Sequence, residues 1–156
     1  MLYKIVLHTH SVLRWVVLFG GLGAFALALK GWLGGGEWGK KNRALHGAFI
    51  GSVHLQVVLG LILYSGLSPL MGTIFKDFGG AMKVASLRFW AVEHITMMII
   101  AAVVAHAAHV LSKKAEEDVD KFKRASLGFG LALFIIFGAI PWPFREAVGR
   151  SLFPGG

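Results

Sequence analysis

Apolar residues gather into four long segments, at about 5–30, 44–66, 86–111 and 125–142, which glycine-rich or charged links separate. Each segment is close to the roughly 20 residues that a helix needs to cross about 30 Å of hydrocarbon. No segment shows the alternation of a membrane β-barrel, and a chain in lipid must satisfy its backbone hydrogen bonds internally. The pattern predicts an all-α integral membrane protein, a four-helix up-down bundle, with residues 1–156 forming a single transmembrane domain.

The three links between these segments differ in character. Residues 31–41 are rich in glycine and carry two tryptophans, which is typical of a hairpin at the headgroup level. The second link contains Pro69 and the glycines at 79–80 among apolar residues, so we expect it to fold back onto the membrane surface. Residues 112–124 are strongly hydrophilic, and we expect them to lie in water.

Composition agrees with a lipid environment. The chain is 56% hydrophobic and 15% charged, with a mean hydropathy of +0.67, which is too apolar for a water-soluble domain. There is no cysteine, which excludes disulfides, cysteine-ligated iron–sulfur clusters and covalently attached c-type haem.

The formal charge of +8 is a topology signal in such a chain and does not indicate a nucleic-acid partner. Nine of the 16 Lys and Arg residues lie in or beside the first and third links, which share one side of the membrane. The positive-inside rule then places both termini in the periplasm, on the outer side of a bacterial inner (cytoplasmic) membrane.

All seven histidines lie within or at the edges of the first three apolar segments, where ionisable side chains are rare and indicate function. A rise of about 1.5 Å per residue sorts most of them into two layers. An outer-to-middle layer holds His10, His54 and His94. A layer near the cytoplasmic edge holds His46, His106 and His109.

The outer layer meets the requirement of a haem iron, which takes two axial imidazoles at similar depth on facing helices. His10 on the first segment and His94 on the third lie at similar depth, and in an up-down bundle those helices are diagonal. His54 with His94 is the competing pair, on adjacent helices. Gly47 and Gly51 precede His54 at spacings that place small residues beside it, as a flat guest requires. The pattern predicts haem b, ligated by His94 with either His10 or His54.

Other ionisable residues extend this hypothesis. Arg14 and Arg88 could bind haem propionates, or could reach toward phosphate headgroups instead. Glu93 could relay a proton or pair with an arginine. His46 and His109 come out at similar depth and could hold a second haem, although histidines at an interface are also unremarkable there.

Four segments of the chain carry a resemblance to a known family: 8–15, 54–64, 88–94 with Met97 and Met98, and 140–144. On these segments the chain resembles the small four-helix cytochrome b-like membrane proteins of Bacteroidetes, which implies a cytochrome b-like role and points to His10, His54 and His94. It is similar, more loosely, to the bacterial di-haem cytochrome b family, whose four histidines hold two haems between quinone and a partner. The fourth apolar segment here has no histidine, which departs from that pattern.

The leading hypothesis is a membrane electron carrier with one or two b haems, working as a quinol-linked or partner-linked oxidoreductase. Its partners would be the lipid bilayer, a quinone or a redox protein, and it could act as a homodimer or within a larger complex. A second hypothesis uses the same three histidines to bind a copper, zinc or non-haem iron ion, as in an oxidase-assembly factor. A third is a structural subunit of a membrane complex, with the histidines in helix–helix hydrogen bonds.

Overall fold

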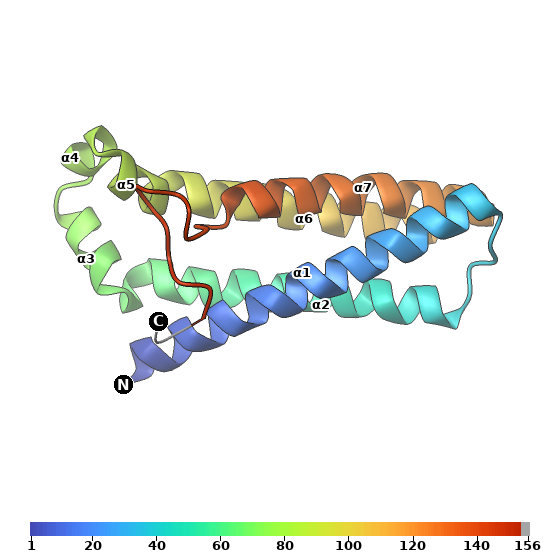
Figure 1. The fold of residues 1–156 in the computed structure, drawn as a ribbon, viewed down its shortest axis with the longest axis horizontal. Coiled ribbons are helices and arrows are strands. Elements are labelled where there is room, and N and C mark those ends of the chain that lie inside the picture. The colour runs from blue at the N-terminus through green and yellow to red at the C-terminus, as the bar shows by residue number, and fades with distance from the viewer. Residues whose placement is uncertain (154–156) are drawn as a thin grey trace.

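The computed structural model describes residues 1–153, and four long helices dominate it (Figure 1). They are α1 (Leu2–Gly34), α2 (Lys40–Ile62), α6 (His94–Lys114) and α7 (Asp118–Ala139), and there is no strand in the described part of the chain. All four are long and apolar enough to cross a membrane. The predicted all-α helical bundle is confirmed. Five of the eight ends lie beyond the predicted ones, as at Lys40 and Asp118, where charged residues continue the helix past the apolar segment. The other three fall short, because α2 ends and α6 begins at a π-helical turn and α7 ends at Ala139, shortly before Pro141.

The second link is more ordered than the sequence indicates. It forms three short helices, α3 (Pro69–Lys76), α4 (Phe78–Lys83) and α5 (Ala85–Arg88), which together cover one end of the bundle. Two π-helical turns connect them to the spans: η1 (Leu63–Leu67) follows α2, and η2 (Phe89–Glu93) leads into α6. Such turns reset the face that a helix presents and are frequent at functional sites.

α1 and α6 lie diagonally across the bundle, as the up-down topology predicts. α1 packs against α2 and α7, and α6 packs against α7 and α2. The core between them combines phenylalanines with alanines, and its members include Phe49, Phe122, Phe129, Ala24, Ala28 and Ala105. A diagonal pair can face a common interior without touching.

The bundle is tightly packed at the end where α1 joins α2 and α6 joins α7, which we call the closed end. There a Cβ on Gly31 of α1 would overlap the ring of Phe122, and nearer the middle of the bundle a Cβ on Gly128 of α7 would overlap Ala108 of α6. These glycines let the helices approach closely.

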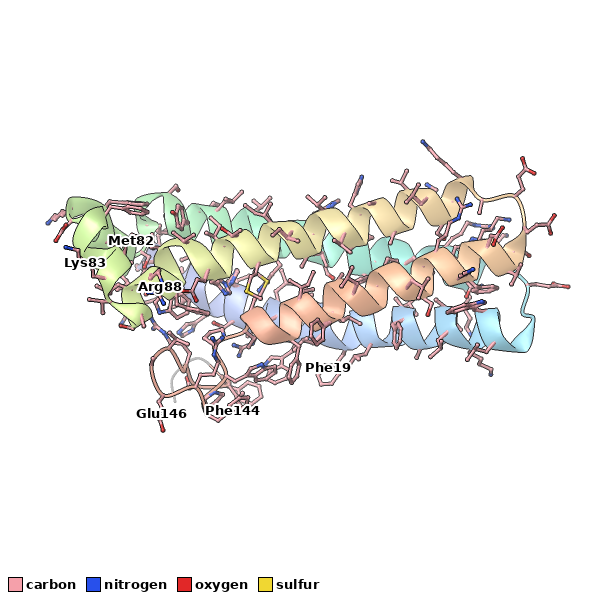
Figure 2. All side chains as sticks on the ribbon, turned by 90° about the horizontal axis from the view of Figure 1, so that it is seen from above. Phe19, Met82, Lys83, Arg88, Phe144 and Glu146 are labelled. Atoms are coloured by element: carbon pink, nitrogen blue, oxygen red, sulfur yellow. The ribbon has the colours of Figure 1, made fainter. Side chains whose placement is uncertain are left out.

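At the other end, which we call the open end, α1 diverges from α7 (Figure 1). The N-terminus lies at this end, together with the short helices and the segment after α7, residues 140–153. Figure 2 shows Met82, Lys83 and Arg88 at this end of the bundle, and Phe144 and Glu146 projecting outward from the segment. The divergence of the helices leaves interior space at the open end.

Candidate functional site

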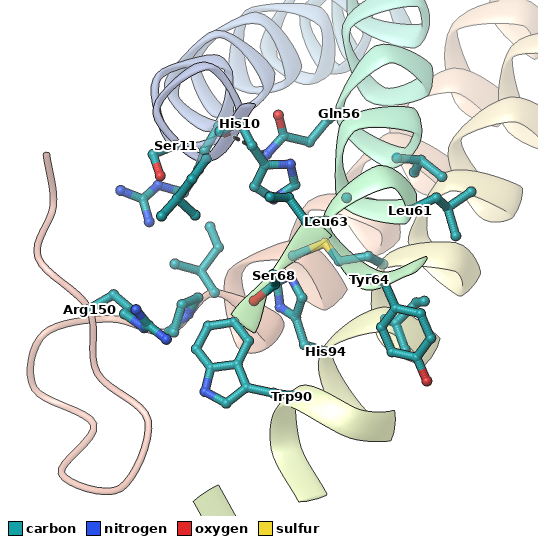
Figure 3. Close-up of a pocket in the computed structure, with 18 of the residues that line it drawn as sticks. His10, Ser11, Gln56, Leu61, Leu63, Tyr64, Ser68, Trp90, His94 and Arg150 are labelled. Carbon is teal, nitrogen blue, oxygen red and sulfur yellow. Dashed lines mark hydrogen bonds between the residues drawn. The ribbon is translucent and has the colours of Figure 1, made fainter. Parts of the chain in front are cut away.

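A cavity of about 300 Å³ occupies the open end, between α1, α2, α6 and the segment that follows α7. Most of its lining is apolar, which is typical of sites for cofactors and small molecules. Three histidines line it: His8 and His10 of α1 and His94 of α6. His8 is exposed, whereas His10 and His94 are partly buried and reach the cavity from diagonal helices (Figure 3). The structure therefore brings together one of the two histidine pairs that the sequence left open.

His94 is held in a defined tautomer and orientation. Its Nδ1 lies 2.9 Å from the backbone carbonyl oxygen of Ala139, at the end of α7. A carbonyl only accepts hydrogen bonds, so Nδ1 carries the hydrogen and Nε2 keeps its lone pair. The rings of Phe89 and Trp90 flank the imidazole, with centroids 5.7 and 5.5 Å away. This arrangement matches that of histidines that bind a metal, whose second nitrogen donates to a carbonyl or carboxylate.

His10 packs edge-on against α2. A Cβ on Gly60 would lie 3.3 Å from Cε1 of His10, so the glycine gives the imidazole its space. One turn earlier, Gln56 donates from Nε2 to the backbone carbonyl of His10 at 2.9 Å. Nδ1 of His10 and Oε1 of Gln56 are buried without a hydrogen-bond partner. Unpaired buried polar atoms are uncommon in folded proteins, and here they belong to residues that line the cavity.

The two arginines expected to meet propionates are separated. Arg14 lines the cavity, and its Nη2 donates to the carbonyl oxygen of Leu152 at 2.6 Å. Arg88 does not line the cavity, because its Nε pairs with Oε1 of Glu93 at 2.8 Å on an exposed surface. Of the two roles considered for Glu93, the structure shows the pairing with an arginine.

The segment after α7 supplies a wall of the cavity that the sequence analysis missed. Arg150 lines the cavity and lies over the ring of Trp90, with 4.9 Å between its guanidinium carbon and the ring centroid. Trp15 of α1 donates to the carbonyl of Leu152 at 3.2 Å and stacks on Phe153 at 5.8 Å. The only sequence signal was a proline-flanked tryptophan at 141–143, which predicted the end of the fourth span and nothing beyond it.

His54 lies elsewhere. It is exposed on the outward face of α2, and its ring lies 5.2 Å from that of His106 on α6. Gly47 and Gly51 share this outward face, and a Cβ on either would meet open space. His54 therefore does not join His10 at the cavity.

Residues 1–153 contain no group of three or more His, Cys, Asp or Glu side chains arranged to hold a metal ion. The three-imidazole arrangement that a non-haem ion would require of His10, His54 and His94 is not formed. A pair of imidazoles facing a cavity remains, which suits a haem better than a bare ion.

His46 and His109 are the two histidines that were considered for a second haem, and His46 lies in the packed core. His46 is fully buried at 0% exposure, with the rings of Trp38 and Phe129 at 4.9 and 4.8 Å. His109 is half-buried on α6, and neither histidine lines the cavity. Aromatic side chains fill the space around His46, where a second macrocycle would need room.

Comparison of the chain with family models, with curated proteins and with solved structures found no match. A functional assignment therefore depends on the cavity and on the side chains that line it.

Proposed function

We propose that this protein is a membrane-bound b-type cytochrome, which holds one haem between His10 and His94 and transfers electrons. The observation that carries the proposal is the entry of two imidazoles, from diagonal helices, into one mostly apolar cavity. When bound, the haem would supply reversible one-electron chemistry at its iron.

The chain's own residues would supply ligands and orientation. The hydrogen bond from Nδ1 of His94 to Ala139 leaves Nε2 available and makes the imidazole a stronger electron donor. Gly60 sets the ring of His10 back against α2, so that the ring does not fill the cavity. The fixed orientation of His94 prepares the site for a flat ligand before that ligand arrives.

Cationic and apolar surfaces divide the cavity in a way that suits an amphipathic macrocycle. Arg14 and Arg150 both line it, and guanidinium groups bind carboxylates such as propionates through paired hydrogen bonds. Much of the remaining lining is apolar, as Val17, Val53, Met98 and Ile136 illustrate, and would contact the macrocycle. The haem would thus be held without any covalent link, as the absence of cysteine requires.

A lipid-soluble quinol is the electron donor or acceptor that the cavity favours. Leu61 of α2 and Ile99 of α6 line the cavity and are also exposed on the outer surface of the bundle, by 44% and 42%. The cavity therefore reaches a surface that would face lipid, where quinones dissolve. The positive charge of the links at the closed end supports an orientation with the open end and both termini toward the periplasm.

The test is optical spectroscopy of the purified protein in mild detergent. We expect a reduced-minus-oxidised spectrum of b type with one haem per chain, which His10→Ala and His94→Ala each abolish and His54→Ala retains. Adding free imidazole to His94→Gly should restore the spectrum, because a small ligand can occupy the vacated position.

Three results would contradict the proposal. One is a preparation that neither contains haem nor binds it on titration. Another is equal loss of haem from His54→Ala and His94→Ala, which would point to a different ligand set. A colourless preparation with one copper, zinc or iron ion per chain would favour the metal-ion hypothesis. Circular dichroism of each variant separates loss of ligand from loss of fold.

A further inference from the structure

The bundle has two kinds of outward face. On α1 and α7 the exposed residues are bulky and apolar, which is the surface expected against lipid tails. They include Val12, Val16, Phe19, Leu127, Leu131 and Phe134. This face needs no partner other than the bilayer.

The outward face of α2 and α6 also exposes large apolar side chains, such as Leu55 and Val103, but it includes a polar patch as well. We call five of its residues the histidine face: Gly47, Gly51, His54, His106 and Ala107. All five are exposed. The two histidines come from different helices, and their ring centroids lie 5.2 Å apart with the planes inclined by 38°. Two imidazoles therefore form one polar patch on an otherwise apolar surface, within helices long enough to cross the membrane.

Such a patch is unfavourable against hydrocarbon. Each neutral imidazole carries one N–H donor and one acceptor nitrogen, and lipid tails can satisfy neither. Polar side chains within spanning helices normally face a protein partner or a water-filled space. Cover by another protein segment would satisfy these donor and acceptor groups.

We propose that the histidine face is a homodimer interface, and that its occupant is the same face of a second copy of this chain. A neutral imidazole both donates and accepts, so the His54–His106 pair complements itself when a two-fold axis places two copies opposite each other. Gly47 and Gly51 leave the α2 backbone uncovered, because a Cβ on either would meet nothing within 4 Å. A symmetric contact sets this bare stretch against its own copy and allows the close helix approach typical of membrane dimers.

The proposal is independent of the cavity. His10 and His94 face the interior of the bundle at the open end, whereas His54 and His106 lie on its exterior. A protein without haem could still form this dimer, and a monomer could still bind haem. The two proposals can therefore fail separately.

The test uses the absence of native cysteines. Single cysteines at Leu55→Cys of α2 and Val103→Cys of α6 report on the proposed interface, and Leu131→Cys of α7 is the matched control. All three native side chains are apolar and exposed, by 51%, 62% and 52%. After mild oxidation in native membranes, we expect a disulfide-linked dimer from at least one of the first two variants and none from Leu131→Cys.

Changes to the face should then weaken the association. In the cross-linking background, His54→Ala combined with His106→Ala should lower the cross-linked fraction about fivefold, and Gly51→Leu should remove it. Förster transfer between differently labelled copies in liposomes gives a second measurement without cross-linking. An unchanged haem spectrum or helix content shows that each variant is folded.

Several results would overturn the proposal. Equal cross-linking from Leu131→Cys would show random collision, and an unchanged yield after the histidine or glycine substitutions would show that the face is not involved. Cross-linking of Leu55→Cys only to a different protein would assign the face to another partner. Absence of both cross-linking and energy transfer would show that the chain is a monomer.

Discussion

Gly60 gives a direct way to test how closely the cavity is fitted around His10. A Cβ at this position would lie 3.3 Å from Cε1 and 3.9 Å from Nδ1 of the imidazole. Comfortable carbon–carbon separations are about 3.5–4.0 Å, so Gly60→Ala requires the ring to move by a few tenths of an ångström. The His10 ring can make room for the new methyl group by turning away from its preferred rotamer or by pushing α1 away from α2.

The size of the effect follows from that displacement. A side chain turned about 30° from its rotamer loses roughly 0.5–1.5 kcal/mol, and a shift of a few tenths of an ångström turns an imidazole through a smaller angle, so this cost is an upper limit. Since about 1.4 kcal/mol corresponds to a tenfold change in affinity, the haem dissociation constant should rise by no more than about tenfold in Gly60→Ala. Gly60→Val adds two more carbon atoms and should prevent binding altogether.

The assay is titration of haem into the haem-free protein in nanodiscs, followed by the absorbance of the bound form. The matched control is Gly20→Ala in α1, because a Cβ there would meet nothing within 4 Å. Equal affinities for Gly60→Ala, Gly20→Ala and the native chain would refute the reasoning, since His10 would then not depend on the space that Gly60 leaves.

Three further outcomes are expected. Arg150→Gln should weaken haem binding several-fold in the same titration, whereas Arg88→Gln should not, because Arg88 is already paired on the surface. Gly128→Ala should lower the free energy of unfolding in detergent titrations by about 1–3 kcal/mol relative to Gly20→Ala, because its Cβ would overlap Ala108 and force α6 and α7 apart. His46→Phe should leave the haem content at one per chain and raise the unfolding free energy by about 1 kcal/mol, because both ring nitrogens of His46 are buried without partners; a fall in haem content would instead reveal a second haem.

The sequence predicted the helices well because the length and apolarity of a span are read directly from composition. The constant rise of a helix also matched His10 with His94 in depth, and these two share the cavity. The same reckoning was wrong for His54 and His106, which it placed in different layers although their rings lie 5.2 Å apart. These features depend on geometry along a helix axis.

The sequence did not predict how each helix is rotated about its own axis, and therefore which side chains face the interior. In a soluble helix the polar side identifies the outward face, but in a membrane both faces are apolar and the pattern gives little direction. Gly47 and Gly51 were expected beside a guest, yet the interior face of α2 carries Phe49 and Val53 and the glycines point outward. His54 points outward with them.

The segment after α7 was missed for a different reason. Residues 140–153 have no helical period, and their position depends on single contacts to distant residues, such as those that Arg14 and Trp15 make with the carbonyl of Leu152. Contacts between residues more than 130 positions apart leave no local pattern in a sequence. Arg150 at the cavity could not be foreseen for that reason.

The contact between Arg14 and Leu152 also bears on how the protein is assembled. α1 precedes α7 in the chain and carries a guanidinium whose backbone acceptor, Leu152, follows α7. During synthesis this charge must be kept hydrated, or be shielded by the insertion machinery, until α7 is in place and the tail turns back. If the protein binds haem as proposed, the haem would enter late, since the wall that carries Arg150 follows α7 in the chain.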